Sequence, residues 1–156
     1  MKKTLVLLLL AGALSVPALA KAPAQGSTVL GAIGLNYSFF SLYTDGLGLT
    51  GLVGHKNHPF QVNLHWSFAN YFGASVDWLF WRGQITQTPF WYYIGVGAGI
   101  GLGGGFNLGA RVPLALQWFP VSQIEVYLEW APGVQIIRTL GFDHALAIGA
   151  RWHFGK

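Results

Sequence analysis

The chain has 156 residues, of which 53% are hydrophobic and 9% are charged, and its formal net charge is +4. Ordinary soluble domains carry about 25% charged residues, so this composition excludes a typical water-soluble protein. The basic residues are few and scattered, which argues against nucleic acid as a partner. The sequence contains no cysteine, so it has neither a disulfide nor a lipid-modified N-terminal cysteine.

The beginning of the chain has the pattern of a secretory signal peptide. Lys2 and Lys3 precede an apolar stretch, and small residues mark a cleavage site after Ala20. The apolar stretch is too short for a helix that crosses roughly 30 Å of hydrocarbon. We therefore expect residues 1–20 to be a signal peptide for export to the periplasm, and residues 21–156 to form one domain.

Beyond this segment, apolar and polar residues alternate as they do in β-strands. At the C-terminal end, Leu146, Ile148, Ala150, Trp152 and Phe154 are apolar at every second position. No uninterrupted apolar stretch is long enough for a transmembrane helix, so a closed barrel remains as the way to satisfy the backbone in lipid. The alternating segments and turns predict an all-β protein, an eight-stranded antiparallel up-and-down transmembrane β-barrel, with strands over 28–43, 47–55, 59–68, 71–81, 89–102, 106–118, 123–137 and 144–154.

One face of the predicted strands is almost entirely apolar and is expected to contact lipid. Trp and Tyr prefer the membrane interface, so the tryptophans of this face predict the two aromatic girdles of a membrane barrel. These lipid-interface aromatics are Trp66, Trp78, Trp118, Trp130 and Trp152. An alternative is a soluble periplasmic barrel that carries an apolar ligand, in which the two faces would be exchanged.

The opposite face carries the polar and charged residues and is expected to point into the lumen. An eight-stranded barrel leaves room only for side chains, so buried charges must pair with each other or with trapped water. Arg111 and Arg151 fall on the two strands that flank the strand carrying Glu125 and Glu129. We therefore predict a lumenal Arg–Glu–Arg network, with Asp77 among its polar residues, that plugs the barrel.

The glycine-rich run of the fifth predicted strand contains Gly99, Gly101 and Gly104 at the spacing of a dinucleotide-binding motif. The alternation that follows, with Pro113 in it, excludes the helix N-terminus that such a motif needs to hold a pyrophosphate. The inward glycines are instead expected to make room for long lumenal side chains such as Tyr127, Arg111 or Trp81.

His65 and Ser67 lie two residues apart on one strand face, so the imidazole could activate the hydroxyl, with Asp77 or Glu129 orienting the ring. This arrangement resembles the His-x-Ser pattern of small barrels that deacylate lipid A. Both side chains are expected to face the lumen, away from acyl chains, so a satisfied polar core is the favoured interpretation and a lipid A hydrolase is the alternative. His55 and His58, in the turn after the second predicted strand, lack a nearby carboxylate or cysteine in the sequence. No metal site and no cofactor are therefore expected.

Three segments of the C-terminal half, over 111–116, 128–133 and 147–154, resemble a family of small, functionally uncharacterised outer-membrane barrels. The mature chain is also similar in plan to the OmpX and OmpA transmembrane barrels. The resemblance implies an integral outer-membrane protein of a Gram-negative cell that contacts outer-membrane lipids and is inserted by the barrel-assembly machinery. It also implies that Phe154 is the terminal aromatic residue of the assembly signal.

The sequence as a whole predicts a non-enzymatic outer-membrane protein with a plugged lumen and a structural or envelope-related role. Its connections are short, which disfavours an adhesin or receptor that binds through long extracellular loops. Arg and Glu side chains inside eight strands disfavour an open pore, and a narrow gated leak for protons or small ions stays open as an alternative.

Overall fold

The computed structural model describes residues 30–41, 45–54, 58–67, 71–137 and 140–154, and the regular structure there is β-strand. Among these residues, no helix is long and apolar enough to cross a membrane. The predicted signal peptide over 1–20 lies outside the described residues. The strands are β1 (Leu30–Phe39), β2 (Gly46–Val53), β3 (Phe60–Ser67), β4 (Tyr71–Gln84), β5 (Phe90–Leu102), β6 (Phe106–Arg111), β7 (Leu114–Val121), β8 (Ile124–Ile137) and β9 (Gly141–His153).

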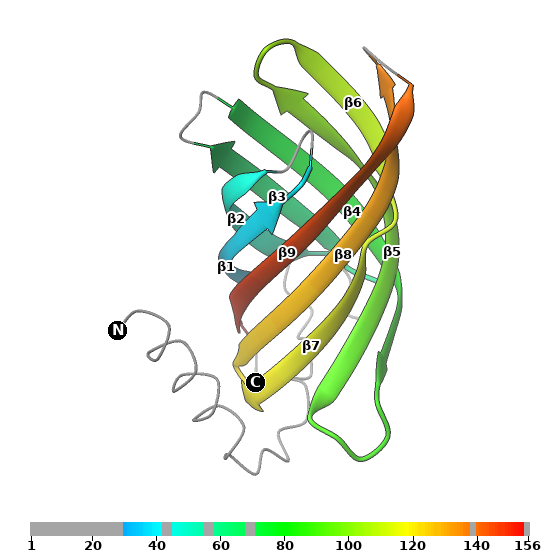
Figure 1. Ribbon diagram of the computed structural model, residues 1–156. Coiled ribbons are helices and arrows are strands. Elements are labelled where there is room, and N and C mark those ends of the chain that lie inside the picture. Colours follow the sequence, from blue (N-terminus) through cyan, green and yellow to red (C-terminus); the bar gives the residue numbers. More distant parts are fainter. Residues whose placement is uncertain (1–29, 42–44, 55–57, 68–70, 138–139, 155–156) are drawn as a thin grey trace, which may run out of the picture.

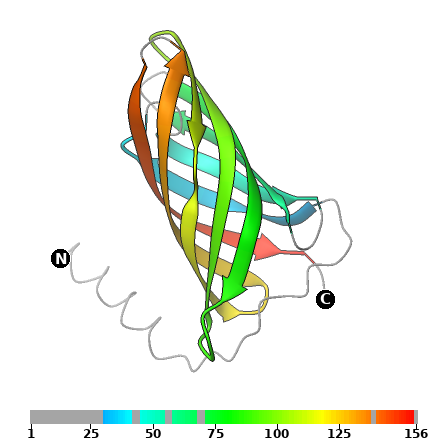
Figure 2. The same ribbon diagram turned by 90° about the vertical axis from the view of Figure 1, so that its right-hand side faces the viewer.

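These strands close into a barrel, which is seen from two sides in Figure 1 and Figure 2. Neighbouring strands are antiparallel, and β9 pairs with β1 to complete the ring. Beyond that ladder, Phe154 N donates a hydrogen bond to the Gly31 carbonyl at 2.9 Å. Strands β6 and β7 together fill one place between β5 and β8. The barrel therefore has eight strand positions, which confirms the predicted architecture.

The two ends of the barrel carry different connections (Figure 1). We call the end at which β1 begins and β9 ends the terminal end. It also carries the β2–β3, β4–β5 and β7–β8 connections. We call the opposite end the loop end. It carries the β1–β2, β3–β4, β5–β6 and β8–β9 connections. The connections between β4 and β5, β5 and β6, and β7 and β8 are fully described and are short, as the sequence predicts; they cover 85–89, 103–105 and 122–123.

Proline interrupts the strand that the sequence predicts over 106–118. Regular pairing stops at Val112 and Pro113, because proline has no N–H to donate to the ladder. Two backbone hydrogen bonds hold the gap: Gly95 N donates to the Pro113 carbonyl at 2.9 Å, and Val112 N donates to the Pro132 carbonyl at 2.8 Å. The wall of the barrel therefore stays continuous across the interruption.

A β-bulge in β4 corrects one detail of the predicted faces. The register between β4 and β5 shifts between Leu79 and Trp81, which moves the following residues to the other face. Trp81 consequently points outward and is 56% exposed, whereas the sequence placed it in the lumen. Leu79, Phe80 and Trp81 are all large and apolar, so alternation alone gives no signal of the bulge.

Alternation sorts the side chains into an apolar outer set and a largely polar inner set. Along β8, the inward residues from Glu125 to Ala131 are buried, while the outward residues between them are exposed or half-buried. The inner set also contains a small apolar cluster, formed by Ala32, Leu52, Leu79, Tyr93 and Ala115. The soluble carrier alternative requires the two faces to be exchanged, so this arrangement does not favour it.

Candidate functional site in the barrel lumen

The part of the lumen toward the terminal end is organised around Glu125, a carboxylate of β8 that is 0% exposed. Its Oε1 accepts hydrogen bonds from Arg151 Nη1 at 3.2 Å and from Gln117 Nε2 at 2.7 Å. Its Oε2 lies 2.6 Å from His153 Nε2. Burial of an unpaired carboxylate is strongly unfavourable, so these partners from the two flanking strands, β7 and β9, hold the charge inside the barrel.

Aromatic side chains cover this group on the side of the terminal end. The ring of Phe119, which is fully buried, lies 5.4 Å from the ring of His153 and 6.4 Å from the ring of Trp91. Phe119 follows Gln117 by two residues on β7 and therefore lies one inward position closer to the terminal end. The ion pair is thus separated from the terminal end by packed rings.

A second group is organised around Glu129, which points inward four residues further along β8. Arg111 Nη2 donates to one oxygen of this carboxylate, while the Tyr93 hydroxyl donates to the other. Gln61 Nε2 donates to the same second oxygen at 2.7 Å. Arg111 also forms an ion pair with Asp77, with 3.0 Å between Nε and Oδ1. One guanidinium therefore bridges two carboxylates, and neutral donors satisfy the remaining oxygens.

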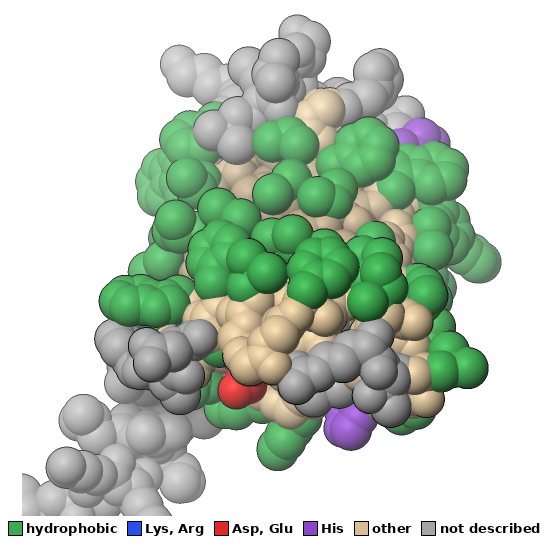
Figure 3. Space-filling model, turned by 90° about the horizontal axis from the view of Figure 1, so that it is seen from above, with side chains coloured by type: hydrophobic (Ala, Val, Ile, Leu, Met, Phe, Trp, Pro, Cys, Tyr) green, Lys and Arg blue, Asp and Glu red, His purple; other side chains and the backbone are tan. Residues whose placement is uncertain are grey.

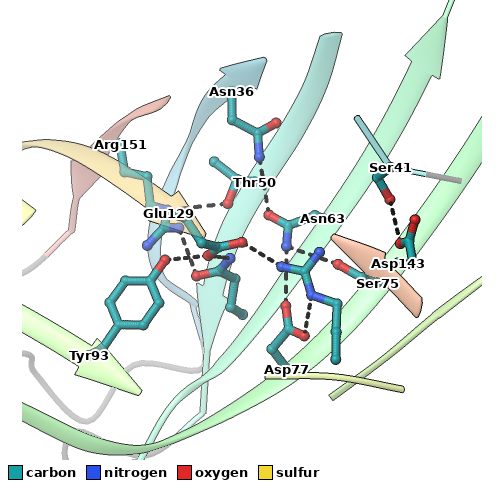
Figure 4. A network of polar contacts seen from close by, with 12 residues as sticks. Asn36, Ser41, Thr50, Asn63, Ser75, Asp77, Tyr93, Glu129, Asp143 and Arg151 are labelled. Carbon is teal, nitrogen blue, oxygen red and sulfur yellow. Dashed lines mark hydrogen bonds and ion pairs between the residues drawn. The ribbon is translucent and has the colours of Figure 1, made fainter. Parts of the chain in front are cut away.

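Gln61 connects the two groups across the lumen. Its Oε1 accepts a hydrogen bond from Arg151 Nη2 at 2.8 Å, while its Nε2 donates to Glu129. The guanidinium of Arg151 also donates to Thr50 Oγ1 at 3.2 Å, and its carbon lies 3.9 Å from the centroid of the Tyr127 ring. Figure 4 shows Arg151, Thr50, Glu129 and Tyr93 converging from separate strands. The charges of both groups therefore belong to one connected network.

The network continues from Asp77 toward the loop end through amide side chains (Figure 4). Asn63 Nδ2 donates to Ser75 Oγ at 3.0 Å and lies 3.5 Å from Asp77 Oδ2. Asn36 Nδ2 in turn donates to Asn63 Oδ1 at 3.5 Å. Asn63 thus presents its N–H groups toward the carboxylate, and Asn36 presents its own toward the carbonyl oxygen of Asn63.

Separate polar contacts lie closer to the loop end. Ser41 Oγ donates to Asp143 Oδ2 at 3.2 Å and ties the end of β1 to β9 (Figure 4). Gln135 Nε2 donates to Asn107 Oδ1 at 2.7 Å and ties β8 to β6. All four residues are buried, so the lumen is polar along most of its length.

Inward glycines provide the space that the network occupies. Gly97 pairs directly with Asp77 on β4 and with Arg111 on β6. A Cβ atom at Gly97 would lie 2.2 Å from Asp77 Oδ1, and one at Gly149 would lie 2.6 Å from the ring of Tyr127. The expectation that inward glycines make room for long side chains therefore agrees with the geometry at Tyr127, although Gly149 belongs to β9 and not to β5. The space at Gly97 lies against Asp77.

The predicted network residues Asp77, Arg111, Glu125, Glu129 and Arg151 all lie inside the barrel and are buried. Each of the two arginines binds the neighbouring glutamate of β8 as the sequence suggests. The neutral members Thr50 and Tyr93 were not among the predicted network residues. Both residues lie an even number of positions from inward-facing glycines of the same strand, and this spacing alone would have placed them in the lumen.

His65, the candidate base of the predicted catalytic pair, is buried inside the barrel. His65 is 2% exposed, and its Nδ1 has no hydrogen-bond partner. The ring instead makes a hydrogen bond to the backbone of Gly46. Asp77 and Glu129, the two residues expected to orient the ring, both pair with Arg111. His65 therefore lies inside the barrel, where acyl chains outside the barrel do not reach it.

The five predicted interface tryptophans lie on the outer face, where Trp66, Trp130 and Trp152 are each more than half exposed. Trp66 lies near the loop end of β3, and Trp152 lies near the terminal end of β9, as expected for two girdles. Trp78 and Trp118 pair with Phe60 and Phe90, toward the terminal end. Trp130 differs, because it lies midway along β8.

The exterior of the barrel is apolar on all sides that the structure describes, and Figure 3 shows hydrophobic side chains around it when the loop end faces the viewer. Among the described residues, no group of three or more His, Cys, Asp or Glu side chains could hold a metal ion. A closed antiparallel barrel with eight strand positions, an apolar exterior and a hydrogen-bonded interior defines a small integral outer-membrane β-barrel of the OmpX-like plan.

Comparison with solved structures finds a similar fold in Neisserial surface protein A. The crystal structure of Neisserial surface protein A (NspA) matches 80% of this chain and 96% of its own chain, with a TM-score of 0.52 and 14% sequence identity. The outer-membrane protein Ail of Yersinia pestis, solved in a phospholipid bilayer nanodisc, matches 80% of this chain and 99% of its own, with a TM-score of 0.48 and 12% identity. No protein-family model matches the sequence, and neither does any curated protein.

Proposed function

We propose that this outer-membrane barrel is a non-catalytic structural protein of the cell envelope whose own side chains close its lumen to solutes. The connected network carries the proposal. It runs from His153 through Glu125, Arg151, Gln61, Glu129 and Arg111 to Asp77. Each of these side chains is buried, and each is held by a partner on another strand.

A permeating ion would have to displace these partners. Breaking one buried pair leaves an uncompensated charge and costs about 3–5 kcal/mol. An eight-stranded barrel is only wide enough for its side chains to fill, so the network leaves little room for a parallel path. The packed rings around Phe119 add a second barrier toward the terminal end. These features support a closed lumen over an open pore or a leak.

We expect the purified barrel to show no stepwise conductance in planar lipid bilayers. Replacing Glu125 and Arg151 together with alanine removes one ion pair without leaving either charge alone, and this variant is expected to show small conductance steps. Gel mobility before and after boiling would establish that both proteins are folded. Conductance by the unaltered protein would contradict the proposal.

We also propose that the chain reaches this membrane through an export signal over 1–20 and is inserted by the barrel-assembly machinery, with outer-membrane lipids as its lasting partners. Phe154 supports this, because it directly follows the last strand and is 40% exposed on the outer face. An exposed aromatic residue at this position is accessible to an assembly factor before the barrel closes. Its backbone N–H then joins the β1–β9 seam.

The lipid A hydrolase remains the second candidate, although the geometry at His65 does not favour it. Replacing Ser67 with alanine tests it, because Ser67 is the required nucleophile. We expect identical lipid A mass spectra from cells that overproduce the unaltered protein, cells that overproduce the variant, and cells that carry an empty vector. Loss of an acyl chain with the unaltered protein alone would establish the hydrolase instead.

A further inference from the structure

The apolar outer surface of the barrel differs in height from one side to the other. On β2, the outward apolar side chains extend from Leu47 to Val53, six residues apart. On β8, they extend from Ile124 to Ile136, twelve residues apart. With about 3.3 Å per residue and a strand tilt of about 40°, these spans rise ~15 Å and ~30 Å along the barrel axis.

We call the strands β1, β2 and β3 the short wall, and the strands β6, β7, β8 and β9 the tall wall. Figure 1 and Figure 2 show the shorter strands on one side of the barrel and the longer strands on the other. The order of strands around the ring places β2 opposite the position that β6 and β7 share. The height difference therefore runs across the whole diameter of the barrel.

Tryptophan and polar residues mark the limits of the short wall. At its loop end Trp66 pairs with Leu47, and at its terminal end Phe60 pairs with Val53 and with Trp78. Tryptophan prefers the membrane interface. The level of Trp66 and the level of Phe60 and Trp78 therefore mark two interfaces that are six residues apart along β3. Two polar residues are described next to them: Asp45 lies beyond Leu47, and the exposed His58 lies beyond Phe60.

The tall wall is apolar over a longer span along β8, along β9, and along β6 and β7 taken together. On β9 the outward side chains run from Phe142, which is 69% exposed, to Phe154. The polar exception is His144, whose ring lies 6.3 Å from that of Phe40 and 5.7 Å from that of Phe142. This histidine is therefore part of an aromatic stack, and the wall stays suited to hydrocarbon over its full height.

Tilting the barrel cannot match both walls to a membrane of uniform thickness. A flat slab cuts the same length from opposite sides of a tilted cylinder, so a tilt moves the entry points without making one wall shorter. A short apolar span is accommodated when the bilayer becomes thinner beside it. We propose that the lipid bilayer is locally thinned beside the short wall, and that this wall is the surface through which the protein perturbs the outer membrane.

This inference rests on the membrane insertion that the proposed function assumes, and spin labels test the two separately. The chain contains no cysteine, so a single cysteine introduced at Asp45 or at His58 can carry a nitroxide without background labelling. Labels at Val126 and Val134 on the tall wall serve as matched controls. Collisions with oxygen and with an aqueous nickel chelate are then compared in dilauroyl- and dierucoylphosphatidylcholine vesicles.

We expect both short-wall labels to stay accessible to the aqueous chelate even in the thick dierucoyl bilayer, while both controls report hydrocarbon. Entry of a short-wall label into hydrocarbon in the thick bilayer would overturn local thinning and leave the barrel in the membrane. Loss of collisions with both reagents would show that a second copy or another protein covers the wall, which also overturns the inference. Controls that report water would instead overturn membrane insertion itself.

A charge-free double variant provides a second test that needs no label. Replacing Asp45 and His58 together with leucine extends the apolar surface of the short wall at both of its ends. We expect this variant to fold faster than the unaltered protein into dierucoyl vesicles and slower into dilauroyl vesicles. The same dependence on acyl chain length in both proteins would contradict the inference.

Discussion

Replacing Glu129 with alanine is expected to lower the free energy of unfolding by about 3–5 kcal/mol, the usual effect of removing one partner of a buried ion pair. The substitution deprives Arg111 of one of its two carboxylates and leaves the Tyr93 hydroxyl and the Gln61 amide without their acceptor. None of these groups can turn to water, because they are buried in the lumen. The urea midpoint of the refolded protein in detergent measures the effect.

Two further variants show whether the effect belongs to the network. Glu129→Gln keeps the size and one acceptor oxygen, so its midpoint should fall between those of the unaltered protein and Glu129→Ala. Trp66→Phe changes a side chain that is 59% exposed on the outer face and should shift the midpoint far less. Equal midpoints for Glu129→Ala and Trp66→Phe would contradict the assignment of the two faces.

The architecture could be predicted from the sequence because two simple requirements determine it: alternation along each strand, and closure of the sheet in lipid. Each strand repeats its pattern every second residue, and lipid leaves a closed barrel as the arrangement that pairs every strand. Departures from the prediction occur where the pattern is interrupted. Pro113 removes a backbone donor and splits one strand into β6 and β7, while the bulge before Trp81 follows a run of large apolar residues that carries no alternation.

The lumenal contacts were less accessible to sequence reasoning. Alternation indicates that Arg111 and Glu129 share the inner face, and their strands are neighbours. The ion pair between Arg111 and Asp77 spans β5, and it forms because Gly97 has no side chain between them. The bond from Arg151 to Gln61 crosses the lumen, so it depends on the diameter and stagger of the barrel. No local pattern encodes those two quantities.

Gly97→Ala is expected to destabilise the barrel strongly, by about 3 kcal/mol or more, because overpacking and the loss of a buried ion pair act together. The added Cβ would lie 2.2 Å from Asp77 Oδ1, 2.3 Å from the Val76 carbonyl oxygen and 2.7 Å from Asp77 Cα. Two of these three atoms belong to the backbone, so a side-chain rotation cannot relieve the contact. Urea titration together with gel mobility before and after boiling would measure the loss.

Gly141→Ala is the matched control, because it makes the same chemical change at a position where an added Cβ meets nothing within 4 Å. Gly141 begins β9 at the loop end and is exposed, so its substitution should leave the midpoint nearly unchanged. If both glycine variants were equally stable, the space beside Gly97 could not be what brings Arg111 to Asp77. The ion pair would then have to form through strand curvature alone, and the sequence of β5 would tolerate larger residues at its inward positions.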